Sequence, residues 1–496
     1  MRTARNDSPP SSVVGGMGTI LLVVLALVWP RAALPSARTS TGSGAPRVAV
    51  ASYRGGSEAD FTRVLVAPGG SVYLAGTTTS EDLPLKRPAM RRQGRYDAWV
   101  TKLRRDGERV LYSTYLGGRG HDVLADATVD AAGNLILVGS TNSDDFPTKN
   151  AFSEQVWGGK DGYVTKLSPS GDVVFSTFYG GTEGDFATAV DVDAAGSVYV
   201  HGYTFSSDFP TTEGALKPSD GEEGQDATVV KLTPEGEVVY ATQLGGSGAE
   251  LGYDVEVDAA GNAYLSGWTD SADFPVVEAG QPEIGGSYDA YVSKLDASGT
   301  RLEFSTFLGG RDLEGGGYLA ERPEGGVAVA LETFSHGLPA TGYQERFGGG
   351  KEDSYLALLA PEGGPVEAAT YLGGSRGDHV QDLDVGADGA LYAVGGTGSP
   401  DFPVKRAFQR RFGGRSRDDY YLGDAFLAKL SSDLSTLVYG SYLGGSRDDG
   451  AASLNTVEGG AWLSGVTYSR DFPTKRAHDP SWNGDSDAWF ARVDDA

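Results

Sequence analysis

A Gly-Gly step that recurs along the whole chain constrains the fold more than any other feature of the sequence. Each step follows a short apolar or aromatic stretch, as in the segment from Phe175 to Gly181. Subtracting neighbouring positions gives spacings of 62 to 71 residues, and self-similarity at a nearly fixed period indicates a repeat protein. The first glycines of the steps are Gly55, Gly117, Gly180, Gly245, Gly309, Gly373 and Gly444. Seven copies of one unit therefore account for most of the 496 residues.

Each copy reads as four short strands. In the third copy, runs rich in valine and aromatic residues are bounded by glycine-containing turns, which is the sequence signal of strands. The four predicted strands are Ala187 to Val192, Ser197 to Thr204, Ala227 to Leu232 and Val238 to Leu244, with a long loop between the second and the third. In β-propellers, four-stranded sheets are repeated radially around a central channel. The predicted fold class is therefore all-β, a seven-bladed β-propeller of four-stranded blades.

The two ends of the repeat array complement each other. The last copy ends with a third strand around Asp487 to Val493, whereas the segment from Arg47 to Gly56 reads as a fourth strand without the three before it. Closure removes the exposed strand edges that an open array would present to other chains. We therefore predict a propeller over residues 47–496 that is closed by the N-terminal strand, which completes the last blade.

Two details of the repeat carry structural expectations. Glycine interrupts the second strand in six copies, which indicates a close approach of the neighbouring blade: Gly76, Gly139, Gly202, Gly267, Gly395 and Gly465. The fifth copy departs most from the pattern, with Arg322 to Gly326 at its first turn, Gly337 to Pro339 in place of Asp-Phe-Pro, and Leu358 where lysine is usual. An irregular fifth blade is therefore expected.

The N-terminal segment resembles an export signal. Arg2 and Arg5 precede the apolar run from Ile20 to Trp29, and Pro35 to Ala37 could serve as a small-residue cleavage site. The alternative is an uncleaved membrane anchor, since Val13 to Trp29 is nearly long enough to cross a bilayer. Residues 1–37 are thus predicted to be a signal peptide or an anchor and residues 38–46 a polar linker. The protein is expected to be exported, to the periplasm, the cell surface or the exterior.

Composition excludes several kinds of site and partner. The chain has no cysteine, so disulfides and thiolate chemistry are ruled out. Its formal net charge of −26 argues against a nucleic-acid partner, because such a surface repels a polyanion. Membrane contact is expected only through an uncleaved N-terminal segment, and a monomer is expected.

Four tracts of the second copy resemble the bacterial seven-bladed β-propeller repeat (SBBP) family. They are Ser113 to Gly118, Val129 to Asn134, Asp145 to Thr148 and Asp161 to Leu167, and the resemblance extends from about Val48 to the C-terminus. It implies a secreted or surface-associated bacterial protein without an activity established for the family as a whole.

The sequence favours a non-catalytic binding or scaffold module. No two of the five histidines share a metal-ligand spacing such as His-x-x-x-His, and no Gly-x-Ser-x-Gly nucleophile motif is present. Arg376-Gly377-Asp378 spells an adhesion tripeptide, but it occupies an ordinary connection between copies. The alternative is a lyase or hydrolase that acts on polysaccharide across the same face, because fold alone does not decide between the two.

An acid follows every Gly-Gly step at the start of the first strand: Asp60, Asp122, Asp185, Glu250, Glu314, Asp378 and Asp449. These seven carboxylates are predicted to ring the channel mouth, and calcium is the cation that such a ring would suit. The other interpretation is that each carboxylate caps backbone N–H groups of its own turn. We prefer capping, and no cofactor, because a feature repeated in every blade is typically structural.

Two further sets of charged residues recur along the chain. The aspartates of the Asp-Phe-Pro loops are good turn residues: Asp82, Asp145, Asp208, Asp273, Asp401 and Asp471. The third strands carry bases at an even spacing: Lys102, Lys166, Lys231, Lys294, Lys429 and Arg492. A buried ammonium needs a partner, and the sequence does not identify it.

The distribution of arginine breaks the repeat. The long loop of the first copy carries Arg87, Arg91 and Arg92, beside Lys86 and Arg95. The loop of the sixth copy carries Arg406, Arg410 and Arg411 together with Lys405, Arg415 and Arg417. Ring closure places both loops next to the seventh blade, and arginine forks suit carboxylate or phosphate groups. This basic sector of the long-loop face is the predicted binding site for an acidic glycan or protein surface; the alternative is solvated charge.

Overall fold

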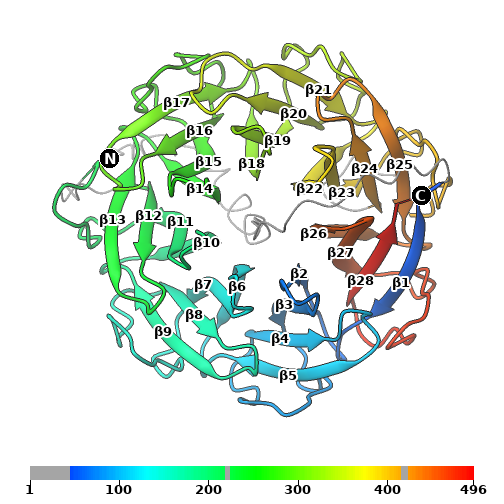
Figure 1. Cartoon of the computed structure of the whole chain (residues 1–496), viewed down its shortest axis with the longest axis horizontal. Coiled ribbons are helices and arrows are strands. Elements are labelled where there is room, and N and C mark those ends of the chain that lie inside the picture. Colours follow the sequence, from blue (N-terminus) through cyan, green and yellow to red (C-terminus); the bar gives the residue numbers. More distant parts are fainter. Residues whose placement is uncertain (1–44, 218–223, 415–422, 496) are drawn as a thin grey trace, which may run out of the picture.

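The computed structural model describes residues 45–217, 224–414 and 423–495. These residues form seven four-stranded antiparallel sheets and no helix. The sheets stand as blades around a central channel, with the first strand of each blade nearest the centre and the fourth at the periphery (Figure 1). The predicted all-β, seven-bladed propeller is confirmed.

The first three blades follow the Gly-Gly period. Blade 1 consists of β2 (Arg63–Val66), β3 (Val72–Thr78), β4 (Asp97–Leu103) and β5 (Val110–Leu116). Blade 2 consists of β6 (Asp122–Val129), β7 (Leu135–Thr141), β8 (Asp161–Leu167) and β9 (Val173–Tyr179). Blade 3 consists of β10 (Asp185–Val192), β11 (Val198–Thr204), β12 (Asp226–Leu232) and β13 (Val238–Leu244).

The other four blades repeat the same order. Blade 4 consists of β14 (Glu250–Val257), β15 (Ala263–Thr269), β16 (Asp289–Leu295) and β17 (Leu302–Leu308). Blade 5 consists of β18 (Glu314–Glu321), β19 (Val327–Thr333), β20 (Asp353–Leu359) and β21 (Ala368–Leu372). Blade 6 consists of β22 (Asp378–Val385), β23 (Leu391–Thr397), β24 (Asp424–Leu430) and β25 (Leu437–Leu443). Blade 7 consists of β26 (Asp449–Val457), β27 (Gly460–Thr467), β28 (Asp487–Asp494) and β1 (Arg47–Tyr53).

The N-terminal strand β1 closes the ring. It pairs antiparallel with β28, with Ser52 opposite Phe490 and Tyr53 opposite Trp489. Arg54, directly after β1, is 2% exposed and donates from Nη2 to Pro84 O, at 2.7 Å, and to two hydroxyl groups of blade 1. The predicted closure is therefore confirmed, and the closing strand binds the blades on both sides of the seam.

The glycines of the second strands have a different role from the predicted one. A Cβ at Gly139 would lie 1.9 Å from the carbonyl oxygen of Val123, in the innermost strand of the same blade and not in the neighbouring blade. The cause is a bulge, because the register of β6 on β7 shifts between Leu124 and Asp126, and a bulge brings the strand backbones together.

Blade 5 is only slightly irregular. It keeps four strands, but Leu331 stands where the other second strands have glycine. The bulge of its innermost strand lies at the same position as in the other blades, but here it is formed by two glycines, Gly316 and Gly317, whose φ angles are +79° and +138°. Its fourth strand is shorter, with five residues.

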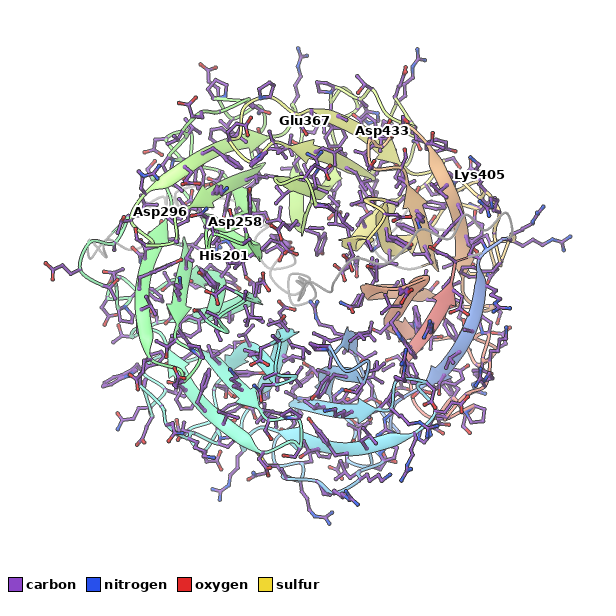
Figure 2. All side chains as sticks on the ribbon, in the orientation of Figure 1. His201, Asp258, Asp296, Glu367, Lys405 and Asp433 are labelled. Atoms are coloured by element: carbon purple, nitrogen blue, oxygen red, sulfur yellow. The ribbon has the colours of Figure 1, made fainter. Side chains whose placement is uncertain are left out.

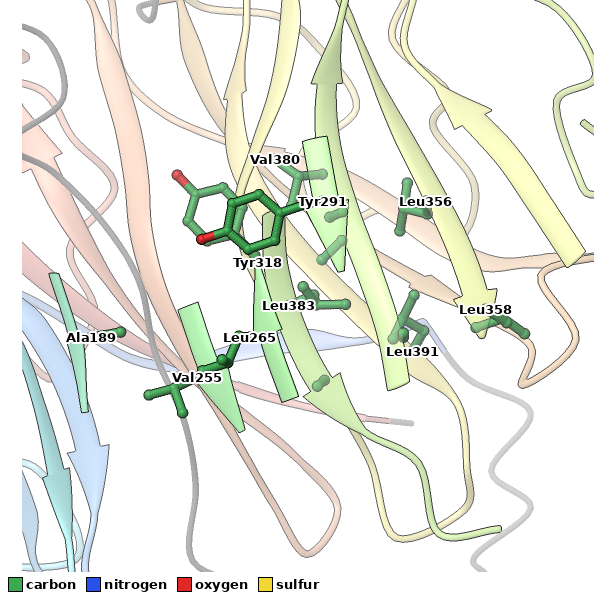
Figure 3. Packing of buried hydrophobic residues seen from close by; sticks show 14 of the residues in the cluster. Ala189, Val255, Leu265, Tyr291, Tyr318, Leu356, Leu358, Val380, Leu383 and Leu391 are labelled. Carbon is green, nitrogen blue, oxygen red and sulfur yellow. The ribbon is translucent and has the colours of Figure 1, made fainter. Parts of the chain in front are cut away.

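Apolar side chains fill the gaps between blades. The largest cluster extends from Ala189 in blade 3 to Tyr442 in blade 6, and part of it is seen in Figure 3, where Tyr291, Leu356 and Val380 belong to three successive blades. Since each sheet is covered on both sides by its neighbours, inner strands tolerate consecutive apolar residues.

Polar groups also connect the blades. Asp126 Oδ2 accepts a hydrogen bond from the backbone N–H of Val190 in the next blade, at 2.8 Å. Asp254 accepts one from Leu319, and Asp382 accepts one from Leu454. At the tight-turn end of the blades, Lys102 Nζ donates to Pro169 O of the next blade at 2.9 Å and lies 4.7 Å from the centre of the Tyr73 ring. The partners of the third-strand lysines are thus carbonyl oxygens and, for some of them, acids of the tight turns.

The long loops cover the outer edges of the ring. After Asp-Leu-Pro, Lys86 exchanges backbone hydrogen bonds with Ser113 of β5, the outermost strand of blade 1. Lys149 does the same with Ser176 in blade 2, and Lys405 with Gly440 in blade 6, where Lys405 lies at the periphery of the ring (Figure 2). Each such segment, here called a strap, shields an edge strand that would otherwise be open to pairing.

Deletion of Arg47 to Gly56 tests the closure. The truncated chain loses the β1–β28 ladder, at roughly 0.5 to 1.5 kcal/mol net for each hydrogen bond, and it loses the burial of Tyr53. We expect aggregation or a much lower Tm by calorimetry, whereas deletion of residues 39–44 should leave the Tm unchanged. An unchanged Tm after the first deletion would show that the ring closes in another way.

Substitution of the second-strand glycine tests the bulge. Gly139→Ala forces a carbonyl oxygen and a methyl group apart, and overpacking of this kind costs about 1 to 3 kcal/mol. Urea unfolding should show that loss. The control is Gly159→Ala, because a Cβ at Gly159 meets no atom within 4 Å; equal stability of the two variants would contradict the assigned role.

Candidate functional site

The long-loop side of the propeller carries the candidate sites. There the Gly-Gly turns and the Asp-Phe-Pro loops are joined directly. Asp145 Oδ1 accepts a hydrogen bond from the backbone N–H of Arg119 at 2.8 Å, and Asp208 Oδ1 accepts one from Thr182. The Asp-Phe-Pro acids therefore hold the turn that enters their own blade.

The seven acids after the Gly-Gly steps are buried below this surface. Asp185 is fully buried, and its Oδ2 accepts hydrogen bonds from the Gly181 N–H at 2.8 Å and from the Ser206 hydroxyl at 2.9 Å. Its Oδ1 accepts one from the Thr204 hydroxyl at 2.5 Å. Asp60, Asp122 and Asp449 make the same kinds of contact. This geometry is the one that the capping interpretation expects, and calcium binding by the ring stays a prediction.

A second acidic residue lies close to each of these seven acids, and the sequence analysis did not identify it. It is the first residue of every third strand: Asp97, Asp161, Asp226, Asp289, Asp353, Asp424 and Asp487. A Cβ at Gly117 would lie 2.7 Å from Asp122 Oδ2 and 3.0 Å from Asp97 Oδ1. The glycine thus leaves room for two carboxyl groups that come from neighbouring blades.

Burial of these pairs changes their protonation. Burial and, to a smaller extent, the neighbouring Asp378 raise the pKa of Asp353 to about 8. Burial likewise raises the pKa of Asp424, Asp449 and Asp487 to about 7. Two like charges close together in a low-dielectric site disfavour ionisation of both, so these pairs retain protons near neutral pH.

The histidines and the adhesion-like tripeptide have structural surroundings. His201 is buried, with Nδ1 2.8 Å from Thr228 O and Nε2 3.2 Å from Ser266 O, and burial lowers its pKa to about 4. His121 is exposed and packs on Tyr96, with 5.0 Å between ring centres. Asp378 of the tripeptide is fully buried and caps Gly374, so its carboxylate is not presented to a receptor.

The basic sector lies on the outer wall rather than around the channel. Because the straps run along the outermost strands, the segments with Arg87 and Arg406 follow the periphery of blades 1 and 6. Arg91, Arg410 and Arg411 are exposed, and Arg92 forms an ion pair with Glu81 at 3.0 Å. Arg415 and Arg417 lie outside the described residues. In ring order blade 7 separates the two groups, and its strap adds Arg476, which pairs with Glu108 of blade 1.

Aromatic side chains near the channel mouth were not anticipated. In blade 3 the rings of Phe186 and Tyr203 stack with 4.7 Å between centres, and Phe205 packs edge-on to both. In blade 4 Trp268 and Tyr288 form a T-shaped pair at 5.1 Å. Phe205 is 37% exposed. These positions differ between copies, and comparison of the copies at the ends of the second strands would have revealed them.

The described residues show neither a metal-binding cluster nor a membrane-spanning helix. No group of three or more histidine, aspartate or glutamate side chains that could hold a metal ion was found there. Within residues 45–217, 224–414 and 423–495, no helix is long and apolar enough to span a membrane. The predicted signal peptide or anchor, residues 1–37, and most of the linker, residues 38–46, lie outside this part of the chain.

Comparison with known proteins agrees with the fold. Residues 239–275 match the family model described as SBBP, beta-propeller repeat. The chain is therefore a seven-bladed propeller that contains the SBBP repeat, as its sequence motifs predicted. A search of curated proteins finds no match.

Similar solved structures are distant. A protein of unknown function from Dyadobacter fermentans is 11% identical, with 91% of this chain and 100% of that chain covered and a TM-score of 0.46. The Neurospora crassa Pan2 WD40 domain is 8% identical, with 92% and 97% covered and a TM-score of 0.43. Kuenenia stuttgartiensis hydrazine synthase is 11% identical, with 81% and 91% covered and a TM-score of 0.41.

The raised pKa values predict how stability depends on pH. A carboxyl group whose folded pKa exceeds its unfolded value stabilises the fold at low pH, and this stability is lost as the pH rises through the folded pKa. Burial lowers the pKa values of His201 and His379 from 6.5 to about 4 and 3. These two histidines therefore make the fold less stable as the pH falls, but only below pH 6.5. The Tm should therefore fall between pH 6.5 and about 8, the range that ends at the pKa of Asp353.

Asp424→Asn gives the matched test of this assignment. The amide cannot ionise, so the decline of the Tm with pH should become shallower in this variant. Glu362→Gln, which changes an exposed acid of a tight turn, should show the same decline of the Tm with pH as the parent. A Tm of the parent that is constant or rises over this range would contradict the assignment.

Proposed function

We infer that this protein is an exported, non-catalytic binding or scaffold module at the bacterial cell surface. It recognises acidic groups of a glycan or of a protein through the basic residues of the straps. The observation that carries the proposal is the exposure of Arg91, Arg410 and Arg411 on the straps of a chain whose net charge is −26. Because the ring is closed, binding does not have to order the backbone that carries these arginines, and the ordering cost is confined to their side chains.

The charge distribution supports this assignment. In an acidic protein, added arginines do not serve solubility, and the other straps are not enriched to the same extent. Contacts at such a rim act mainly through the association rate and weaken as salt screens them. Recognition of the acidic partner should therefore depend strongly on ionic strength.

Catalysis on polysaccharide across the long-loop side remains the second candidate function. It requires an acid and a base that share one site, and the feature that favours it is the pair of neighbouring carboxyl groups of Glu332 and Glu352, in which burial raises the pKa of both. Release of reducing ends or unsaturated sugars from envelope polysaccharide would support it.

Replacement of Arg91, Arg92, Arg410 and Arg411 by serine tests the binding proposal. We expect unchanged folding by circular dichroism and at least a tenfold loss of binding to an anionic polysaccharide such as polygalacturonate at low salt, because the exposed charges of Arg91, Arg410 and Arg411 are removed. The control removes the same charge from the tight-turn side, with Arg104, Arg105, Arg109 and Arg301 changed to serine. Parent-like binding by the first variant would refute the proposal.

A further inference from the structure

Blade 3 carries an aromatic cluster that no other blade repeats. The cluster consists of Phe186 on β10, Tyr203 on β11 and Phe205, which directly follows β11. Each of the other copies has at most one phenylalanine, tyrosine or tryptophan at the three equivalent positions. These positions hold Phe61, Thr77 and Thr79; Val123, Ser140 and Asn142; Leu251, Trp268 and Asp270; Gly315, Glu332 and Phe334; His379, Gly396 and Gly398; and Gly450, Val466 and Tyr468. A departure confined to one blade, on the loop side of a rigid scaffold, is typical of a binding site.

The three rings of the aromatic cluster pack into one surface. Phe186 is opposite Tyr203 in the β10–β11 ladder, and their rings are nearly parallel, at 11° and with 4.7 Å between centres. Phe205 stands edge-on to both rings, with 6.3 and 5.8 Å between centres. Phe205 is 37% exposed, whereas Phe186 and Tyr203 are half-buried. The cluster therefore offers aromatic surface to solvent at the long-loop end of blade 3.

Glycine leaves the space beside the aromatic cluster uncovered. A Cβ at Gly184 would lie 3.2 Å from Phe186 Cε2 and 3.7 Å from Phe205 Cδ2, so a side chain at this position would contact both rings. In blade 2 the equivalent residue is His121, whose ring packs on Tyr96 with 5.0 Å between centres. A ring from outside the protein can take the corresponding place in blade 3.

A lysine borders the same space. Lys160 directly precedes β8 of blade 2, and its Nζ lies 5.1 Å from the centre of the Phe186 ring. The backbone of Lys160 forms a bridge with Gly184, so the lysine adjoins the uncovered position. Lys160 is half-buried, and burial lowers the pKa of its ammonium group. A charge in such surroundings costs free energy unless an anion pairs with it.

Lys160 forms no ion pair with the residues that the structure describes. The acids next to it hold turns instead, because Asp161 accepts hydrogen bonds from two backbone N–H groups of its own loop and Asp185 caps its Gly-Gly turn. By contrast, Lys166 Nζ of the same blade lies 3.0 Å from Asp130 Oδ2. The unbalanced charge of Lys160 therefore favours an anionic group from outside the protein.

Aromatic rings beside one ammonium group suit a sugar that carries a carboxylate. The C–H groups on one face of a pyranose pack against the negatively charged face of an aromatic ring. An ammonium group donates charge-assisted hydrogen bonds to a carboxylate. Single-stranded nucleic acid also stacks on aromatic rings, but it carries a phosphate for every base and gains affinity from several cations, whereas the aromatic cluster adjoins one lysine.

We propose that the aromatic cluster of blade 3 binds a pyranose ring of an acidic glycan and that Lys160 binds its carboxylate. The sugar lies over Gly184 and packs on Phe205, and the Lys160 ammonium donates to a carboxylate oxygen. This site rests on the proposed function, recognition of an acidic glycan, but it is formed by blades 2 and 3 and not by the straps of blades 1 and 6. It adds recognition of the sugar ring to the attraction of charge.

The test compares trigalacturonate with its methyl ester, which keeps the sugar rings but lacks the charges, by isothermal titration calorimetry. The acid should bind at least tenfold more tightly, because esterification removes the charge that pairs with Lys160. Lys160→Gln should abolish this preference, Lys160→Arg should retain it, and Phe205→Thr should weaken the binding of trigalacturonate several-fold. Gln225 and Thr79 occupy the equivalent positions of other copies, so both changes suit the fold.

Two control variants separate this site from other surfaces. Phe152→Ala with Lys351→Gln should bind trigalacturonate like the parent, because Phe152 is 38% exposed, Lys351 is exposed, and both lie outside the site. The serine variant of the four basic-sector arginines should also bind trigalacturonate like the parent, even where it loses polygalacturonate. Failure of the proposed function is therefore distinguishable from failure of this site.

Four results would overturn the site or its ligand. Equal binding of the acid and the ester, or parent-like binding of trigalacturonate by Lys160→Gln or by Phe205→Thr, would contradict the proposed contacts. Loss of trigalacturonate binding in the serine variant would assign the trimer to the basic sector. Equally tight binding of triglutamate or of a thymidine trinucleotide would refute the assignment to a sugar.

Discussion

The hydrogen-bonded ladder between β1 and β28 is the constraint on which the rest of the propeller depends. Blade 7 takes three strands from the C-terminal end of the chain and its outermost strand from the N-terminal end. The seam is reinforced by Tyr53, whose hydroxyl donates to Ser469 O at 2.9 Å, and by the buried Arg54. Without this pairing, blade 7 would present an open edge and the strap that covers β1 would have no strand to cover.

A closed ring explains why so much charge is buried. Repeated aspartates hold the Gly-Gly turns, inner-strand acids such as Asp126 accept backbone N–H groups of the next blade, and lysines such as Lys166 join tight turns of neighbouring blades. These contacts lie between repeats, so each copy needs its neighbour to satisfy its polar groups. The buried acids favour the protonated state, which links the stability of the ring to pH.

Features that repeat along the sequence could be predicted from it, whereas contacts between copies could not. The Gly-Gly period and the incomplete ends predicted seven blades and their closure. The role of Gly139 was misassigned because the bulge of the inner strand depends on pairing register, which strand propensity does not encode. The partner of Lys102, a carbonyl oxygen of the next blade, leaves no residue-type signal. Asp97 and its equivalents recur in every copy and could have been found. Glu332 and Glu352 are visible only where copy five is compared with the others.

The most direct test of the account is a cross-link across the seam, because the chain has no cysteine of its own. Ala51 exchanges both backbone hydrogen bonds with Lys475 of the strap, so its pairing with Ala491 is of the non-hydrogen-bonded kind, with Cα atoms about 4.5 Å apart, which a disulfide spans. Ala51→Cys with Ala491→Cys, refolded under oxidising conditions, should give one cross-linked species by mass spectrometry with a raised Tm. Ala51→Cys with Ala357→Cys should give none. Failure of the first pair to cross-link in a folded protein would contradict closure by the N-terminal strand.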